Sequence, residues 1–206
     1  MKIIGVSCSA RKGQTTQESL EVCLNAVANE SSGIKTGIIE LADLDVRGCL
    51  GCGYCKNKLE CKQEDDFNSL IPVISDEEVA GIIIATPVYL GTMTSQCKAF
   101  LDRTVVLARN GLLLHNKVGA VLAVGGVRNG GQELTIQAVQ AAMLCHDMVC
   151  VGAGSKAAHF GAALVSNEEK GIEYDEIGIE AAMDIGRRVA DLAMLLNRDS
   201  KSKLGN

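Results

Sequence analysis

The chain has 206 residues, of which 47% are hydrophobic and 3% aromatic, and its formal net charge at pH 7 is −5. This length suits one domain with a substantial buried core, and the apolar content argues against a wholly disordered chain. The acidic balance and the absence of tryptophan argue against the basic surfaces and base-stacking platforms of nucleic-acid-binding proteins.

The first residues do not resemble an export signal. Met1 and Lys2 lead directly into a short apolar run that is better explained as a first strand. No apolar run approaches the roughly 18 residues of a membrane span. Nine cysteines would suit a disulfide-rich secreted protein, but the number is odd and four lie in one short stretch. We therefore expect a cytoplasmic protein without a membrane or nucleic-acid partner, in which the clustered cysteines bind metal.

Short apolar runs alternate with amphipathic segments along the chain. The runs are mostly continuous, as in parallel strands covered on both faces, and span residues 2–7, 36–41, 79–86, 118–124 and 148–151. Segments with helical periodicity lie at residues 14–29, 67–75, 95–108, 131–145 and 174–197. This order predicts a single α/β domain over residues 1–197 with a doubly wound parallel sheet, and a frayed tail over residues 198–206. Right-handed crossovers would place every strand-to-helix loop at one edge of the sheet.

The first of these loops contains hydroxyl side chains, two cations and one glycine, and it opens directly into a helix. Free N–H groups and the helix dipole favour an anion at such a helix start. Hydroxyl groups can donate to phosphate oxygens, and an arginine can pair with the charge. We therefore predict a phosphate site formed by Ser9, Arg11, Lys12, Gln14, Thr15 and Thr16. The loop is neither a Walker A loop nor a dinucleotide fingerprint, and the alternative is a capped helix start with solvent-facing cations.

Two later loops are suited to a planar ligand. After the third strand, Pro87 and Val88 lead to Tyr89, whose ring can lie against a flat ligand, and Gly91 permits close backbone approach. After the fourth strand, the open backbone comes from Gly125, Gly126, Gly130 and Gly131, and Arg128 can offset charge on a reduced ring. The alternatives are a tyrosine that only packs on the sheet and a turn-rich connection without a ligand.

One phosphate loop and two loops for a flat ring with a polar edge match the requirements of FMN. Flavodoxin-like sheets bind this mononucleotide at the carboxyl ends of their strands. We therefore expect a flavodoxin-like five-stranded parallel sheet with strand order 2-1-3-4-5.

Four cysteines form the most specific pattern in the sequence. The spacing is C-x₂-C-x₂-C-x₅-C, and glycines at 51 and 53 let the backbone curl so that thiolates converge. Bacterial ferredoxins use a related run, whereas structural zinc sites usually have two separated pairs. We predict one 4Fe-4S cluster in a loop at about residues 45–66, inserted after strand two, with the ligands Cys49, Cys52, Cys55 and Cys61. Zinc, disulfides and a loop without a cluster are the alternatives.

These pieces together resemble the iron–sulfur flavoprotein family, within the NADPH-dependent FMN reductase group of flavodoxin-like proteins. The matching segments are residues 9–15, 49–61, 87–91 and 128–133, with Cys8, Ala10 and Gln14 in place of the glycine, proline and asparagine usual in the family. The resemblance implies one FMN and one 4Fe-4S cluster per subunit, in a homodimer or homotetramer. It also implies a ferredoxin-like electron donor and a small acceptor such as oxygen or peroxide.

The function expected is an electron-transfer oxidoreductase that couples the cluster to FMN, with NAD(P)H as a further candidate donor and a quinone as a further acceptor. The alternatives are an NAD(P)H-dependent FMN or quinone reductase without a working cluster, and a redox or metal sensor. No catalytic side chain is predicted. The acidic run at residues 64–66 is interpreted as a helix cap, and Cys8, Cys23, Cys97, Cys145 and Cys150 as buried small hydrophobic residues.

Overall fold

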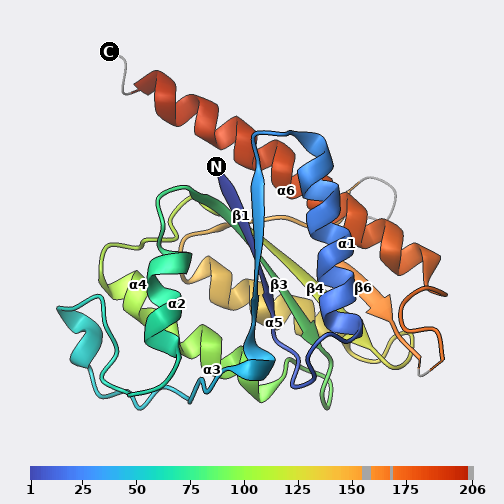
Figure 1. Cartoon of the computed structure of the whole chain (residues 1–206), viewed down its shortest axis with the longest axis horizontal. Coiled ribbons are helices and arrows are strands. Elements are labelled where there is room, and N and C mark those ends of the chain that lie inside the picture. Colours follow the sequence, from blue (N-terminus) through green and yellow to red (C-terminus); the bar gives the residue numbers. More distant parts are fainter. Residues whose placement is uncertain (155–158, 168, 204–206) are drawn as a thin grey trace.

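The computed structural model describes residues 1–154, 159–167 and 169–203. A parallel sheet with the order β2-β1-β3-β4-β5 forms its centre, and β6 also pairs with β4 (Figure 1). The strands are β1 (Lys2–Ser7), β2 (Lys35–Glu40), β3 (Val79–Pro87), β4 (Val118–Gly125), β5 (Val149–Cys150) and β6 (Ala162–Val165). The predicted flavodoxin-like strand order is confirmed.

Helices cover both faces of the sheet (Figure 1). One face packs against α1 (Thr15–Glu30) and α6 (Glu176–Lys203). The other face packs against α2 (Phe67–Ile74), α3 (Ser95–Arg103), α4 (Val105–Arg109) and α5 (Gln132–Leu144). Two short 3₁₀ helices, η1 (Leu41–Asp43) and η2 (Tyr54–Lys56), follow β2.

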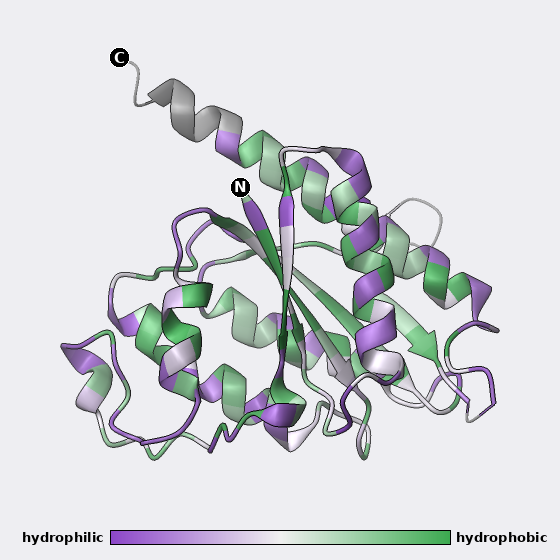
Figure 2. Ribbon diagram, in the orientation of Figure 1, coloured by the Kyte–Doolittle hydropathy of each residue, from purple (hydrophilic) through white to green (hydrophobic). Residues whose placement is uncertain are grey.

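Strand β3 shows why the apolar runs are continuous. Ile82 and Ile84 point into the core shared with α2 to α5, whereas Ile83 and Ala85 point into the core shared with α1 and α6. Alternate side chains of a strand face opposite sides of its sheet, so a strand between two helix layers must be apolar on both. Figure 2 shows the resulting hydrophobic centre, with more hydrophilic residues along the outer loops.

The fifth position of the sheet differs from the prediction. A single strand at residues 148–151 was expected, but β5 covers only Val149–Cys150 and pairs with the start of β4. The missed strand, β6, pairs with Leu122 to Gly125 at the end of β4. Its sequence begins with two alanines after a glycine, which have little intrinsic strand preference, so pairing with β4 decides its structure.

Two helix boundaries also differ. The predicted helix at 95–108 is divided at Thr104, whose hydroxyl donates to the Leu101 carbonyl oxygen at 2.6 Å. That local side-chain bond competes with the regular helix ladder. The final helix continues to Lys203 instead of ending at Asn197, and the helices expected at 14–29, 67–75 and 131–145 are confirmed to within a residue or two.

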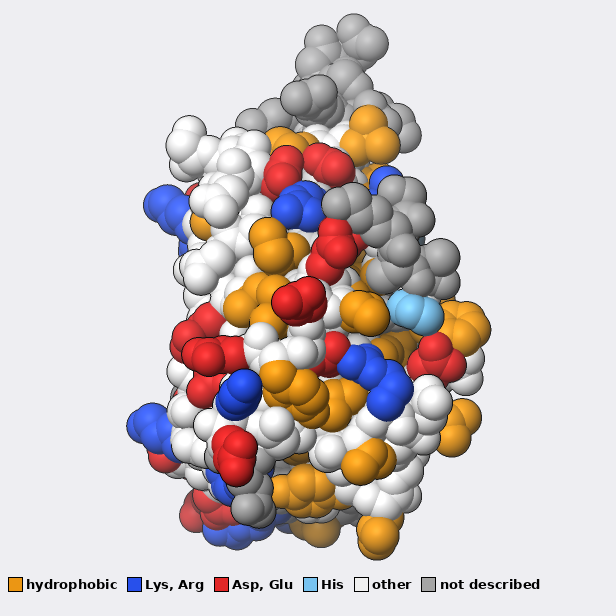
Figure 3. Space-filling view, turned by 90° about the vertical axis from the view of Figure 1, so that its right-hand side faces the viewer, with side chains coloured by type: hydrophobic (Ala, Val, Ile, Leu, Met, Phe, Trp, Pro, Cys, Tyr) orange, Lys and Arg blue, Asp and Glu red, His pale blue; other side chains and the backbone are white. Residues whose placement is uncertain are grey.

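The carboxyl ends of the strands, and the loops that follow them, lie along the lower edge of the molecule in Figure 1. The cysteine-rich loop lies between η1 and α2 at this same edge. On the side that carries α6, charged side chains of both signs are interspersed with small apolar groups (Figure 3). Among the described residues, no helix is sufficiently long and apolar to span a bilayer.

Candidate functional site

The loop after β1, residues 8–14, leads directly into α1. The helix begins at Thr15, and the side chain of its N-cap residue, Gln14, makes no capping hydrogen bond. The first N–H groups of a helix have no partner within it, so they and the positive end of the dipole remain available at this edge. Ser7, at the end of β1, is buried, and its hydroxyl has no partner among the described residues. These features suit a bound phosphate ester.

An open hollow of about 800 Å³ lies beside this helix start. Four predicted site residues line it, namely Arg11, Gln14, Thr15 and Gly126. The remaining lining residues, which the sequence analysis did not predict, are Glu18, Ser166, Asn167 and Gly171. Arg11 therefore contributes a cation to the hollow, and Glu18 contributes a carboxylate with the opposite charge.

The loop after β6 forms the wall that the sequence analysis missed. Its Ser166 N–H donates to the Gly125 carbonyl oxygen at 2.9 Å, and its Asn167 N–H donates to the Gly171 carbonyl oxygen at 3.0 Å. The first bond joins the loop to the end of β4, and the second joins Asn167 to Gly171 within the loop. The available signal was a short apolar run at 162–165 followed by a hydroxyl and an amide, the same strand-then-polar pattern as in the other loops.

Three predicted phosphate residues lie outside this hollow. The ammonium group of Lys12 forms an ion pair with Asp43 of η1. Ser9 is buried, and its Oγ accepts a hydrogen bond from the Arg11 N–H at 3.0 Å. Thr16 is buried in the first turn of α1. Ser9 therefore shapes the loop that carries Arg11, whereas Lys12 forms an exposed ion pair that contributes little to its shape.

Pro87 ends β3, and the loop that follows begins with Val88 and then makes a two-residue turn. Tyr89 and Thr92 exchange backbone hydrogen bonds of 2.8 and 3.2 Å across it. The central residues, Leu90 and Gly91, have φ angles of 49° and 79°. Glycine adopts such angles freely but leucine does so at a cost, and Leu90 is fully exposed at the tip. A strained apolar residue on an exposed loop is a frequent mark of a binding site.

The two loops predicted to hold a ring meet at their glycines. A Cβ atom on Gly131 would lie 2.9 Å from Cα of Gly91, and the φ angle of Gly131 is 106°. Only glycine permits both the close approach and the backbone angle. The loops after β3 and β4 therefore form one continuous wall.

Gln132 holds the loop after β4 in shape. Its side-chain oxygen accepts from the Gly130 N–H at 2.8 Å, and its amide nitrogen donates to the Val127 carbonyl oxygen at 2.7 Å. A side chain at Gly125 would overlap the Gln132 amide, which accounts for the glycine there. This buried glutamine is a supporting residue for which the sequence showed no distinct signal.

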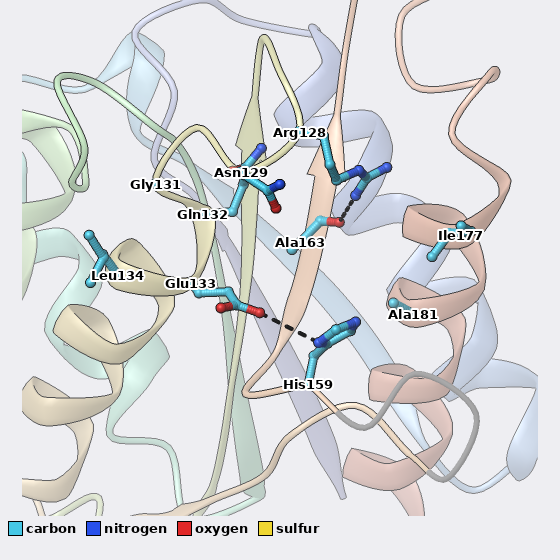
Figure 4. Close-up of a pocket in the computed structure, with 10 residues that line it drawn as sticks. All are labelled: Arg128, Asn129, Gly131, Gln132, Glu133, Leu134, His159, Ala163, Ile177 and Ala181. Carbon is cyan, nitrogen blue, oxygen red and sulfur yellow. Dashed lines mark hydrogen bonds and ion pairs between the residues drawn. The ribbon is translucent and has the colours of Figure 1, made fainter.

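Arg128, which the sequence analysis placed at the flavin ring, has partners within the chain. Its guanidinium donates to the Ala163 carbonyl oxygen at 3.1 Å and pairs with the buried carboxylate of Asp175. Asp175 also accepts from the Val165 N–H at 2.7 Å (Figure 4 shows the arginine and Ala163). These contacts give Arg128 a structural role at the end of β6, and its role in offsetting charge on a reduced ring stays a prediction.

A second, smaller hollow of about 290 Å³ lies between α5 and α6 (Figure 4). Arg128 and Gly131 line it, and the Nδ1 atom of His159 lies 3.5 Å from a carboxylate oxygen of Glu133. Six of the predicted site residues therefore line one or other of two hollows on either side of the loop after β4, four in the larger hollow and two in the smaller.

The cysteine loop has a curled backbone. Gly51 and Gly53 have φ angles of 63° and 77°, as expected for glycines that turn the chain between cysteines. Cys49 and Cys52 are exposed, Cys55 is buried and Cys61 is half-buried. Within the part of the chain that the structure describes, no three histidine, cysteine or carboxylate side chains form a group that could hold a metal ion. The structure thus brings the four cysteines into one loop but does not gather their sulfur atoms.

Helices α2 and α4 hold the second half of this loop. The Arg109 guanidinium donates to the Cys55 sulfur at 3.2 Å, and Asn110 donates to the Cys55 carbonyl oxygen at 3.0 Å. Asn68 of α2 bonds both the N–H and the carbonyl of Cys61, at 2.8 and 2.9 Å. Cationic and N–H donors around sulfur suit thiolates that ligate a metal cluster.

The acidic run contributes a buried ion pair, and its predicted role at the start of α2 is confirmed for Asp65, whose carboxylate accepts a hydrogen bond from the N–H of Phe67, the first residue of α2, at 3.2 Å. Asp65 receives two hydrogen bonds from Arg103, at 2.6 and 2.8 Å, and both side chains are almost fully buried. Arg103 also donates to the Arg47 carbonyl oxygen at 2.9 Å. Asp66, at the N-cap of α2, makes no side-chain capping bond. The pair therefore ties both ends of the cysteine loop to α3.

The five cysteines outside the loop are mostly placed as expected. Cys8, Cys23 and Cys97 are buried, and burial raises the pKa of the Cys8 and Cys23 thiols. Cys150 is half-buried, but Cys145 is exposed at the end of α5. The expectation of burial is therefore wrong for Cys145, because a helix end in a loop region leaves its side chain in solvent.

Known proteins share this architecture and much of this sequence. The family model of NADPH-dependent FMN reductases matches residues 1–163. An iron–sulfur flavoprotein of Methanocaldococcus jannaschii is 39% identical over 198 residues, which cover 96% of this chain and all of that protein. The chain belongs to the iron–sulfur flavoprotein family, within the NADPH-dependent FMN reductases. Members of this group are flavin-dependent oxidoreductases, and this chain is one.

Another iron–sulfur flavoprotein, from Methanosarcina thermophila, is 38% identical over 97% of this chain and all of that protein. Among solved structures, RosB with a bound riboflavin-phosphate intermediate aligns with a TM-score of 0.75 at 19% identity, over 96% of this chain and 81% of RosB. A WrbA-like flavodoxin from Agrobacterium tumefaciens gives a TM-score of 0.62 at 18% identity, over 94% and 98% of the two chains. These structural matches support the flavodoxin-like fold.

Proposed function

We propose that this iron–sulfur flavoprotein transfers electrons between a ferredoxin-like donor, or NAD(P)H, and a small acceptor such as oxygen, peroxide or a quinone. FMN would supply one- and two-electron chemistry and a 4Fe-4S cluster would supply single electrons. The observation that carries the proposal is the position of the cysteine loop, which lies on the same sheet edge as the three loops suited to FMN.

The flavin half of the proposal is supported by the hollow beside α1. Arg11 and the uncapped helix start suit the phosphate, and Thr15 offers a hydroxyl donor in the same hollow. The wall formed at Gly91 and Gly131 offers backbone groups and the exposed Tyr89 to a flat ring. On this proposal the chain's contribution is to orient the ring at the edge where the cysteine loop lies.

The cluster half is supported by the donor set. Cys49, Cys52, Cys55 and Cys61 lie in one loop with two glycine-permitted bends, and an arginine donates to one of the sulfurs. These residues would hold the cluster. Cys49 and Cys52 lie at the surface, whereas Cys55 is buried and Cys61 is half-buried.

The second candidate function is an NAD(P)H-dependent FMN or quinone reductase without a working cluster. The observation that favours it is that the described structure gathers no three metal-binding side chains. In that case the cysteine loop would only cover the flavin edge, and reduction of FMN by NAD(P)H would not depend on cysteine.

Anaerobic purification followed by measurement of iron, acid-labile sulfide and flavin tests the proposal. We expect iron and sulfide in equal amounts together with one FMN per chain. Flavin without iron or sulfide would contradict the proposed function.

The Cys52→Ser variant separates the two candidates. We expect this variant to lose iron and to lose electron transfer from reduced ferredoxin. The simple reductase would be supported if the wild-type protein contains no iron and NAD(P)H reduces the flavin of the variant at the wild-type rate.

We further propose that the chain acts in the cytoplasm as a homodimer or homotetramer, without a nucleic-acid or membrane partner. Leu50 and Leu90 support self-association, because both are exposed apolar residues on loops at the functional edge. Light scattering of the purified holoprotein measures the assembly directly, and a monomeric mass would contradict this part of the proposal.

A further inference from the structure

The two halves of the cysteine loop are held very differently. At Cys49 the structure gives one contact to sulfur, from the Gly51 N–H at 3.4 Å within the loop itself. Cys55, in contrast, receives a hydrogen bond from Arg109 of α4, a helix that packs against η2. The loop therefore has an exposed half and a half attached to the folded core.

The backbone around Cys55 is fixed by the residue next to Arg109. The Asn110 amide donates to the carbonyl oxygens of Cys55 and Lys58, each at 3.0 Å, and to that of Val106 in α4 at 2.8 Å. Since α4 belongs to the folded core, these bonds hold the Cys55 backbone at a defined place. The guanidinium of Arg109 thus approaches a sulfur atom whose position is already restricted.

A second arginine lies near the other attached cysteine. The Arg103 side chain is almost fully buried, and its Nε atom has no hydrogen-bond partner among the described residues. Burial alone would lower the pKa of Arg103, but its bonds to Asp65 and its proximity to Cys61 raise it. Arg103 therefore carries its charge beside Cys61. It also holds Asp65, so replacing it would disturb the fold as well as any sulfur contact.

A guanidinium beside a sulfur ligand has a defined electrostatic effect. Reduction adds a negative charge to a cluster, and a nearby cation that donates to sulfur stabilises the reduced form more than the oxidised form. The reduction potential of the cluster is then higher than it would be without the cation. An N–H donor also restricts the orientation of the ligand, as hydrogen-bonding partners of metal ligands do elsewhere.

We propose that Arg109 is a positioning residue that holds the Cys55 sulfur toward the cluster and raises the reduction potential of the cluster. This inference rests on the proposed function, because it requires the cysteine loop to bind the cluster. It adds Arg109, which lies outside the cysteine motif on α4, to the residues that set the direction of electron flow.

The experiment compares the anaerobically purified wild-type holoprotein with Arg109→Gln, Arg109→Lys and Arg47→Gln. Arg47 is a matched control, because it lies in the cysteine loop and its exposed side chain pairs with Asp45 without touching sulfur. The midpoint potentials of the cluster and of FMN are measured by redox titration, followed by electron paramagnetic resonance and visible absorbance, and iron content is measured in parallel.

We expect Arg109→Gln to shift the cluster potential to a more negative value while the FMN potential stays near that of the wild type. Arg109→Lys, which keeps the charge, should show a smaller shift, and Arg47→Gln should show almost none. If Arg109→Gln loses iron, Arg109→Lys is expected to retain it.

An unchanged cluster potential in Arg109→Gln would overturn the inference, as would an equal shift in Arg47→Gln or loss of iron in both Arg109 variants. Failure of the proposed function would give a different result, namely a wild-type protein that contains no iron and no sulfide. Because the inference requires the cluster, that result would also overturn the inference.

Discussion

At the scale of single residues, Arg11 and Lys12 show how adjacent cations can take different roles. Arg11 lines the hollow beside the start of α1, whereas Lys12 pairs with Asp43. Sequence reasoning assigns both to the phosphate because they are neighbours in a loop. Their separation depends on where η1 folds, and only the tertiary structure determines that.

The two residues therefore make a matched pair for measuring flavin binding. We expect Arg11→Ala to weaken FMN binding about tenfold or more, because a charge-assisted hydrogen bond contributes about 1.5–3 kcal/mol. Lys12→Ala should bind FMN nearly as the wild type does. Fluorescence titration of the flavin-free protein with FMN measures both affinities. Equal weakening in the two variants, or loss of iron in step with flavin in Arg11→Ala, would contradict the assignment of separate sites.

At the scale of elements, the cysteine loop depends on a buried ion pair. Arg103 of α3 reaches Asp65 and the Arg47 carbonyl, so one side chain joins the two ends of the loop. Arg103 also lies over the Phe67 ring, 4.6 Å from its centre, which adds a cation–π contact. The loop is therefore attached to the helical layer at both of its ends.

We expect Asp65→Asn to lower the free energy of unfolding by about 3 kcal/mol, because it leaves the buried Arg103 without a compensating charge. Asp66→Asn is the control, since Asp66 is exposed and accepts a single bond from the Asp45 N–H. Chemical denaturation at neutral pH measures both variants. A loss in Asp65→Asn no greater than that in Asp66→Asn would argue against the role of the pair.

The same pair predicts a pH dependence. Burial alone would raise the pKa of Asp65, but the hydrogen bonds from Arg103 lower it below its ordinary value of 3.8. A carboxylate with a lowered pKa in the folded state stabilises the protein above its unfolded pKa, and this contribution is lost as the pH falls through the folded pKa. The stability difference between wild type and Asp65→Asn should therefore narrow on acidification below about pH 4. A difference that is constant from pH 7 to pH 3 would contradict this.

At the scale of the whole molecule, the contact between α1 and α6 closes one side of the sheet. A Cβ atom on Gly186 would overlap the Cys23 carbonyl oxygen and lie 2.9 Å from Cβ of Ala26. The two helices therefore approach backbone to backbone at this point. Figure 1 shows α6 crossing α1 obliquely, and both helices pack on the face opposite α2 to α5.

We expect Gly186→Ala to destabilise the protein by up to about 2 kcal/mol, because overpacking costs about 1–3 kcal/mol and the helix preference of alanine offsets about 1 kcal/mol. Gly33→Ala is the control, since its Cβ would meet the Ser31 hydroxyl at an ordinary 3.6 Å. Thermal and chemical unfolding followed by circular dichroism measure both. Stabilisation by Gly186→Ala would show that the helices separate without cost.

Much of the candidate site could be predicted because its residues follow strands. The order of strands and the residues between them place Arg11, Thr15, Tyr89 and the glycines at one edge without knowledge of any contact. Ser166 and Asn167 escaped prediction because the strand before them forms only through pairing with β4. Gln132 escaped it because a glutamine side chain is usually exposed, whereas this one is buried. Asp65 escaped it because its partner Arg103 lies on a helix whose position no local pattern encodes.

By itself, the sequence determined the parallel sheet, its strand order, the positions of most helices and the grouping of four cysteines in one loop. These follow from hydrophobic periodicity and spacing, which are local properties of the chain. The tertiary structure alone decided the divided fifth strand, the pairing of Arg128 with Asp175 and of Lys12 with Asp43, and the donation of Arg109 to Cys55. Long charged side chains select partners by distance and burial once the elements have packed, and that choice is made in three dimensions.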